Sequence, residues 1–216
     1  MKAWAIVVAG GSGSRFGSAK QYAELAGRPL VAWALDGARS HCEAVVLVVP
    51  AVDATAGAPR WDADVVVSGG SSRSASVRAG LAAVPAGVEA VVVHDAARPL
   101  AGEAIWRAVL GAVQAGADAA IPTVAVTDTV KVVHADGTLS TLDRNRLVAV
   151  QTPQAFRADV LRRAHAGGAD ATDDAALVEA IGGRVVTVAG SPTNVKVTEP
   201  SDLVVAAALF GQGADR

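Results

Sequence analysis

The stretch Trp4–Gly13, WAIVVAGGSG, joins an apolar run directly to a group of glycines. Five consecutive apolar residues over 4–8, rich in β-branched side chains, are typical of a buried strand. Glycines immediately after a strand let the backbone approach a ligand closely, and their N–H groups can point at an anion. We therefore expect a buried strand over residues 4–8 that ends in an anion-binding turn.

Two basic residues, Arg15 and Lys20, follow these glycines and add permanent positive charge. Backbone N–H groups and two cations together favour a polyphosphate ligand. The segment lacks the P-loop pattern because Ala19 precedes the lysine, and it lacks the dinucleotide fingerprint because Phe16 replaces the third glycine. A plain glycine turn with solvated basic residues is the alternative interpretation. The candidate nucleotide-binding residues here are Ala9, Gly10, Gly11, Ser12, Gly13 and Ser14.

The composition bounds the class of protein. A chain of 216 residues that is 51% hydrophobic can bury a substantial core, and we expect a single domain over 1–216. A net charge of −2 gives no indication of a nucleic-acid or membrane-surface partner. One cysteine, Cys42, excludes an intramolecular disulfide and a multi-cysteine metal site. Without a secretory signal or an apolar run approaching ~20 residues, we expect a cytoplasmic protein.

Valine-rich runs alternate with helical patterns along the chain. We expect strands at 4–8, 44–49, 64–67, 89–94, 119–121 and 185–188, and helices around the apolar stripe at 30–38, over 72–84, over 102–115 and after Pro200. Continuous apolar strands that alternate with helices predict an α/β protein with a Rossmann-like, mostly parallel sheet flanked by helices. Ligands of such sheets bind at the carboxyl ends of the strands.

Residues 123–154 break this alternation. They are rich in β-branched residues and contain the turn signal ADGT at 135–138. This pattern predicts a β-arm inserted at about residues 125–150. The unpaired edges of an exposed arm need cover, which a symmetric dimer provides. A hairpin folded back on its own sheet is the alternative.

Polar clusters at the expected strand ends are candidates for chemistry. In VHDAARP at 93–99, Asp95 and Arg98 suit a hydroxylated, phosphorylated ligand, whereas a local Asp–Arg pair closing a turn is the alternative. His94 and Asp95 also match a metal-binding dipeptide, but the other histidines show no ligand spacing. The segment 71–76 opens a helix after two glycines, either as a site for an anion or a polar ligand or with an ordinary serine N-cap.

Two later segments allow a functional and a structural interpretation each. Residues 172–174, TDD, are typical of a helix N-terminus with acids in its first turn, and a catalytic carboxylate pair is the weaker alternative. In TNVKVT at 193–198, Lys196 is either a further phosphate ligand or an exposed strand lysine.

Taken in order, these segments resemble the 2-C-methyl-D-erythritol 4-phosphate cytidylyltransferase family from about residue 3 to 209. The motifs that carry the resemblance are the glycine-rich segment with Arg15 and Lys20-Gln21-Tyr22, Gly69-Gly70 with Arg73 and Ser76, and residues 94–99, 128–131, 143–145, 152–154, 172–173 and 194–198. The family usually has proline where this chain has Ala19. The resemblance implies CTP and methylerythritol phosphate as substrates, a divalent cation such as Mg²⁺, and a homodimer held by the β-arms.

The resemblance also implies roles for single residues. Catalysis would fall to Arg15, Lys20, Arg144 and Lys196. Gly70, Ser71 and Ser76 would contact the cytosine. The sugar phosphate would be held by Asp95, Arg98, Thr129, Arg144, Thr172 and Lys196, with Thr129 and Arg144 reaching across the dimer. Asp95 is the candidate metal ligand, beside CTP phosphates and water.

In the implied reaction, a substrate phosphate oxygen attacks the α-phosphorus of CTP in line and pyrophosphate leaves. This nucleophile is already anionic, so the reaction needs position and positive charge rather than a general base. A ribitol or glycerol phosphate cytidylyltransferase and a catalytically silent nucleotide-binding regulator remain as alternatives. The segments DAARP and NVKVT fit a sugar-1-phosphate nucleotidyltransferase or a molybdopterin guanylyltransferase poorly. Phe16 and Pro50 speak against an NAD-binding oxidoreductase.

Overall fold

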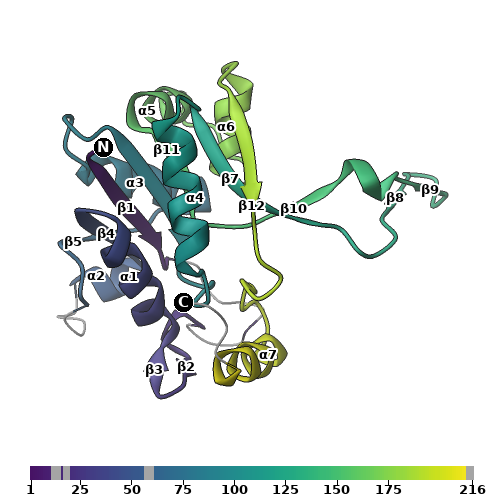
Figure 1. Ribbon diagram of the computed structural model, residues 1–216, viewed down its shortest axis with the longest axis horizontal. Coiled ribbons are helices and arrows are strands. Elements are labelled where there is room, and N and C mark those ends of the chain that lie inside the picture. The colour runs from purple at the N-terminus through teal and green to yellow at the C-terminus, as the bar shows by residue number, and fades with distance from the viewer. Residues whose placement is uncertain (11–15, 17–19, 56–60, 213–216) are drawn as a thin grey trace.

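A computed structural model describes residues 1–10, 16, 20–55 and 61–212 of the chain. Its elements, in chain order, are β1 (Ala3–Val8), the 3₁₀ turn η1 (Lys20–Tyr22), β2 (Glu24–Leu25), β3 (Arg28–Pro29), α1 (Leu30–His41), β4 (Ala44–Val49), α2 (Ala51–Thr55), β5 (Val65–Ser68), α3 (Arg73–Ala83), β6 (Ala90–Asp95), α4 (Glu103–Gln114), β7 (Ala119–Ala125), β8 (Lys131–Val133), β9 (Leu139–Thr141), the 3₁₀ turn η2 (Arg144–Arg146), β10 (Val148–Val150), β11 (Gln154–Arg157), α5 (Ala158–His165), α6 (Asp174–Ala180), β12 (Val185–Ala189) and α7 (Pro200–Gly211) (Figure 1).

The central sheet is mixed and mostly parallel, as the sequence predicts. Strand β1 lies between β4 and β6, so that Ile6 is in register with Val46 on one side and Val93 on the other. Strand β5 follows β4 outward, while β6 leads in the opposite direction toward β11 and β7. Because the strand order reverses at β1, a crevice opens outside the carboxyl ends of β1, β4 and β6.

Two antiparallel strands interrupt this pattern. Strand β11 is inserted between β6 and β7, pairing Ala155 with Val92 on one side and with Ala120 on the other. Strand β10 pairs antiparallel with β7 farther along the same edge, and β12 runs parallel to β7 on its other edge. The sequence analysis did not predict β11, because its four residues are too few to show a period.

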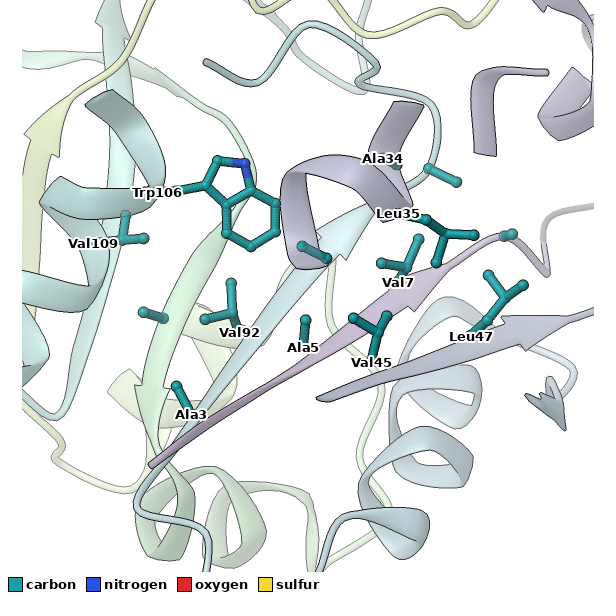
Figure 2. Close-up of a cluster of buried hydrophobic side chains, with 14 of the residues drawn as sticks. Ala3, Ala5, Val7, Ala34, Leu35, Val45, Leu47, Val92, Trp106 and Val109 are labelled. Atoms are coloured by element: carbon teal, nitrogen blue, oxygen red, sulfur yellow. The ribbon is translucent and has the colours of Figure 1, made fainter. Parts of the chain in front are cut away.

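Helices cover both faces of the sheet. Alternate strand residues point to opposite sides, so that Val92 packs with α1 and α4 while Val91 packs with α3, α5 and α6. Figure 2 shows Trp106 and Val109 of α4 above the side chains of β1 and β6, with Leu35 of α1 beside them. Trp106 is fully buried and fills this layer. No helix in the described part of the chain is long and apolar enough to span a bilayer.

The predicted β-arm is present and leaves the body of the molecule (Figure 1). Strands β8 and β9 form their own two-stranded sheet, so the alternative of a hairpin folded onto the main sheet is wrong. Large apolar side chains along the arm are exposed: Val132, Val133, Leu139, Leu142 and Val148. Within the arm, residues 144–146 form the turn η2, which the Asp143 side chain caps by accepting a hydrogen bond from the Asn145 N–H.

Helix α3 packs closely on the sheet at Gly80. A Cβ atom there would lie 2.6 Å from Ile6 Cγ2 and 3.0 Å from Val48 Cγ2, whereas a Cβ atom at the exposed helical Gly111 would meet nothing within 4 Å. We expect Gly80→Ala to destabilise the protein by about 1–3 kcal/mol through overpacking. Gly111→Ala, the matched control, should stabilise it by roughly 0.5–1 kcal/mol. Urea unfolding of both variants checks this, and equal effects would contradict the packing of α3 against β1 and β4.

Candidate active site

A cleft of about 680 Å³ lies at the carboxyl ends of the parallel strands, where the sequence predicts the site. Strand β1 leads into Ala9 and Gly10, and β5 leads into Gly69 and Gly70. Strand β6 ends at Asp95 on the far side of the cleft. The residues Gly11–Arg15, predicted to bind nucleotide and to act in catalysis, lie outside the described residues.

The turn at Gly69-Gly70 approaches helix α3 too closely for a side chain. A Cβ atom on Gly70 would lie 2.5 Å from the Cβ of Ala75. The Gly70 N–H donates to Ser76 Oγ at 3.1 Å, and that hydroxyl donates to the Ser72 carbonyl at 2.9 Å. Ser76 is therefore buried in the turn and fixes its shape, while the exposed Ser71 borders the cleft.

The first turn of α3 has an ordinary serine cap. The Ser72 side chain accepts a hydrogen bond from the Ala75 N–H at 3.0 Å. The structural interpretation of this serine-rich segment is thus correct for Ser72. Its neighbours Ser71 and Arg73 line the cleft. The start of α3 therefore has an ordinary cap and is also part of the site.

Two lysines from distant parts of the chain meet at this cleft. Lys20 Nζ donates to the Val197 carbonyl at 3.2 Å, and Lys196 Nζ lies 2.6 Å from Asp95 Oδ2. Lys196 belongs to the loop between β12 and α7, so the alternative of an exposed strand lysine is correct in its exposure and wrong in its strand. The loop is fastened to the β6 side by the bond from the Val197 N–H to the Ala97 carbonyl, 2.8 Å long.

Asp95 is the meeting point of the charged groups. Its Oδ1 accepts from Arg73 Nε at 3.2 Å, and its Oδ2 pairs with Lys196. Burial alone would raise the pKa of Asp95, but the Arg73 and Lys196 cations outweigh it and hold that pKa well below its usual range. Asp95 is therefore a charged hydrogen-bond acceptor at neutral pH.

Arg98 does not form the local ion pair with Asp95 that the sequence allows. Its guanidinium donates to the carbonyls of Asn194, at 2.7 Å, and Val150, at 3.3 Å. Only the backbone closes a turn here, through the bond from the Arg98 N–H to the Asp95 carbonyl. Arg98 thus braces the Lys196 loop against the base of the arm.

A smaller pocket of about 260 Å³ adjoins the cleft. It brings together four residues predicted to bind substrate, namely Asp95, Arg98, Thr172 and Lys196. Asp95, Lys196 and Arg73 line both spaces. The site therefore has two compartments, and these three charged residues form the boundary between them.

His94 lies beneath Asp95 as a neutral side chain. The Thr152 hydroxyl accepts from the Asp95 N–H and donates to His94 Nδ1, so the proton of the ring stands on Nε2 and donates to the Arg98 carbonyl. Burial lowers the pKa of His94 to about 4, against the opposing effect of the Asp95 carboxylate. Among the described residues, no three His, Cys, Asp or Glu side chains are grouped to hold a metal ion.

Two predicted site residues, Thr129 and Arg144, stand apart from both compartments. They lie on the arm, and the Arg144 guanidinium donates to the Thr127 carbonyl at 2.6 Å. Neither lines the cleft or the smaller pocket. Among the described residues of the arm, only Val150 at its base lines a compartment of its own chain.

Two charged residues of the site were missed by the sequence analysis. Arg73 belongs to a motif of the resemblance but has no predicted role, although it begins α3 shortly after the glycine turn that follows β5. Asp174 stands in the first turn of α6, as the sequence predicts, but it is fully buried and its Oδ2 lies 2.7 Å from Arg73 Nη1. The sequence holds no signal for its burial, because the same pattern is common on helix surfaces.

Comparison with known proteins identifies the family. The model of the family IspD, 2-C-methyl-D-erythritol 4-phosphate cytidylyltransferase, matches residues 3–212. The chain belongs to this family. The resemblance seen in the sequence and the predicted α/β fold are thereby confirmed, and the chain is a nucleotidyltransferase.

Individual relatives agree with this assignment. The chain is 45% identical over 219 residues to the 2-C-methyl-D-erythritol 4-phosphate cytidylyltransferase of Nocardia farcinica, covering 97% of this chain and 94% of the relative. It is 43% identical to the bifunctional enzyme IspD/IspF of Solidesulfovibrio magneticus, of which it spans 56%. The crystal structure of the Thermus thermophilus enzyme superposes with a TM-score of 0.83 at 35% identity, covering 97% of this chain and 98% of that one.

The burial of neutral His94 predicts a pH dependence of stability. Its folded pKa of about 4 lies below the ordinary value of 6.5, so the unfolded chain binds more protons between these pH values. Stability should fall as pH decreases through this window, by up to about 1.4 kcal/mol per pH unit from this residue. His94→Gln should flatten the dependence, measured by urea unfolding between pH 7 and 4.5. His134→Gln, on the exposed arm, should keep it, and an unchanged slope in His94→Gln would contradict the assignment.

Proposed function

We propose that this chain transfers CMP from CTP to 2-C-methyl-D-erythritol 4-phosphate and releases pyrophosphate. The observation that carries this is the two-compartment site with shared Arg73, Asp95 and Lys196, in a chain that matches its family from residue 3 to 212. The family match favours this reaction over the alternatives of ribitol or glycerol phosphate transfer and of a silent regulator.

The charge of the larger compartment suits a triphosphate. Its lining in the described part of the chain includes three cationic side chains, Lys20, Arg73 and Lys196, against the single carboxylate of Asp95. Clefts lined by one sign of charge attract ligands of the opposite sign. We assign this compartment to CTP, with the cytosine at Gly70 and Ser71 and the phosphates near Lys20.

The smaller compartment suits the polyol phosphate. Asp95 is an ionised acceptor for hydroxyl groups, and Lys196, Arg98 and Thr172 offer donors to a phosphate. A phosphate held there would face the α-phosphorus of CTP across the boundary residues. This alignment, together with cations that stabilise the negative charge building up on the α-phosphoryl group, would supply the catalysis. No general base is needed, because the attacking phosphate oxygen is already anionic.

A divalent cation fits this donor set as a companion of the nucleotide. Both oxygens of Asp95 already have cationic partners, so phosphate oxygens and water would supply most of the ligands, with Asp95 as the protein's contribution. Bound Mg²⁺ would offset negative charge on the phosphates as pyrophosphate leaves.

We further propose a homodimer held by the arms. The exposed apolar side chains of the arm, such as Val133 and Leu139, need cover, and Thr129 and Arg144 would then enter the partner's smaller compartment. A cytoplasmic location stays a prediction from the sequence.

The function is tested by pyrophosphate release with CTP and Mg²⁺, comparing methylerythritol 4-phosphate with ribitol 5-phosphate. We expect turnover with the former only. Turnover with ribitol phosphate alone would retain the chemistry and replace the acceptor. CTP binding without turnover on either acceptor would favour the regulator.

The shared site is tested by two variants and their mixture. Lys20→Ala should lower kcat by two or more orders of magnitude, as the loss of one transition-state contact costs about 3–4 kcal/mol. Arg144→Ala should raise the KM for the polyol phosphate more than the KM for CTP. Mixing the two variants should restore part of the activity through heterodimers that carry one intact site.

The control for these variants is Lys2→Ala, which removes an exposed lysine just before β1, at the end of that strand opposite to the cleft. It should keep wild-type kinetics. Near-normal turnover in Lys20→Ala would remove Lys20 from the mechanism, and a mixture without any gain would show that each site is built from one chain.

A further inference from the structure

The charged boundary of the site continues into the protein interior. Arg73, which contacts Asp95 through Nε, contacts Asp174 through Nη1 at 2.7 Å. The other oxygen of Asp174 lies 3.0 Å from His165 Nε2. Arg73 forms ion pairs with Asp95 and Asp174, and the hydrogen bond between His165 and Asp174 extends this ion-pair chain, which runs from the end of β6 through α3 and α6 to α5.

The inner end of the ion-pair chain is withdrawn from solvent. The Asp174 side chain is 0% exposed and that of His165 is 2% exposed. A buried carboxylate is costly unless each of its oxygens has a hydrogen-bond donor. Asp174 meets this condition with one donor from Arg73 and one from His165. Loss of either donor would leave a buried carboxylate oxygen without a hydrogen bond.

The position of Arg73 depends on its contacts with both Asp95 and Asp174. Burial disfavours its charge, but Asp95 and Asp174 together outweigh burial and raise the pKa of the guanidinium. Asp95 accepts a hydrogen bond from Nε and Asp174 accepts one from Nη1, so the two carboxylates attract the guanidinium from different sides. If His165 no longer donates to Asp174, the free oxygen of that carboxylate competes for the guanidinium and draws it away from Asp95.

Asp174 also anchors the start of α6, where the smaller compartment is lined by Thr172 and Asp173. The Asp173 side chain caps the helix, accepting from the Ala176 N–H at 2.9 Å. Arg73 lines both compartments, whereas Thr172 and Asp173 line only the smaller one, so a change that moves Arg73 and the start of α6 together should act more on the polyol-phosphate end.

We propose that His165 and Asp174 are positioning residues, which hold Arg73 against Asp95 and thereby set the affinity for the polyol phosphate. Neither residue touches substrate. The inference rests on the proposed function for its kinetic consequence, while the orientation of Arg73 can be observed without any reaction.

The kinetic test compares His165→Leu with His165→Gln. Leucine keeps the volume but cannot donate, whereas the glutamine Nε2 can take the place of the histidine Nε2. We expect His165→Leu to raise the KM for methylerythritol 4-phosphate about five- to tenfold, as for the loss of one hydrogen bond of ordinary strength, with the KM for CTP changed less than about twofold. His165→Gln should stay within about threefold of the wild type.

The matched control is Asp159→Asn, which removes an exposed ion pair with Arg163 on the same helix α5. It should change neither KM. If His165→Leu does not fold, His165→Asn replaces it, because the shorter amide does not reach Asp174. Equal KM values for the polyol phosphate in the donor-free and donor-retaining variants would overturn the proposal.

The second readout is the Arg73 Nε–H signal in ¹⁵N-labelled protein, assigned by its loss in Arg73→Lys. We expect this signal to shift in His165→Leu and to remain in place in Asp159→Asn. An unmoved signal in a folded His165→Leu variant overturns the proposal. If the wild type proves inactive on both acceptors, the proposed function fails while this signal still decides on the ion-pair chain.

Discussion

The Asp95 carboxylate between Arg73 and Lys196 is the interaction on which the site depends. It joins three parts of the chain that are far apart in sequence: the end of β6, the first residue of α3 and the loop before α7. Each of these parts also lines the compartments on either side. The cations keep Asp95 ionised despite its burial, and the carboxylate in turn offsets the repulsion between the two cations in a confined space.

Around this interaction, further hydrogen bonds give the loops their shape. His94 and Thr152 support the backbone at Asp95, and Arg98 extends the support to Asn194. The Asn194 side chain donates to the Thr152 carbonyl at 3.0 Å, which ties the Lys196 loop to the segment between β10 and β11. The catalytic edge is therefore held in shape by hydrogen bonds within the protein itself.

The sequence predicted the parts of the molecule that depend on local patterns. Strands such as β1 and β4 are continuous apolar runs, and the turn at Gly69-Gly70 is marked by its glycines. The predicted site residues Asp95 and Lys196 do meet, because strand ends of one sheet converge at one edge. Contacts between side chains that are far apart in the sequence could not be predicted. Nothing near Asp174 in sequence indicates that Arg73 lies 2.7 Å away, or that Arg98 turns from its near neighbour to Asn194. The roles of Gly11–Arg15, Thr129 and Arg144 stay predictions.

The register at the base of the arm has a consequence for how the chain can vary. Ala125 of β7 is paired with Val148 of β10, so the arm departs from and rejoins the sheet at adjacent positions. The entropic cost of closing a loop grows only slowly with the number of residues in it. The arm can therefore open locally, lengthen or change its tip while the pairing of β7 with β10 stays intact. Residues can therefore be gained or lost in the arm without disturbing the strand ends that line the site.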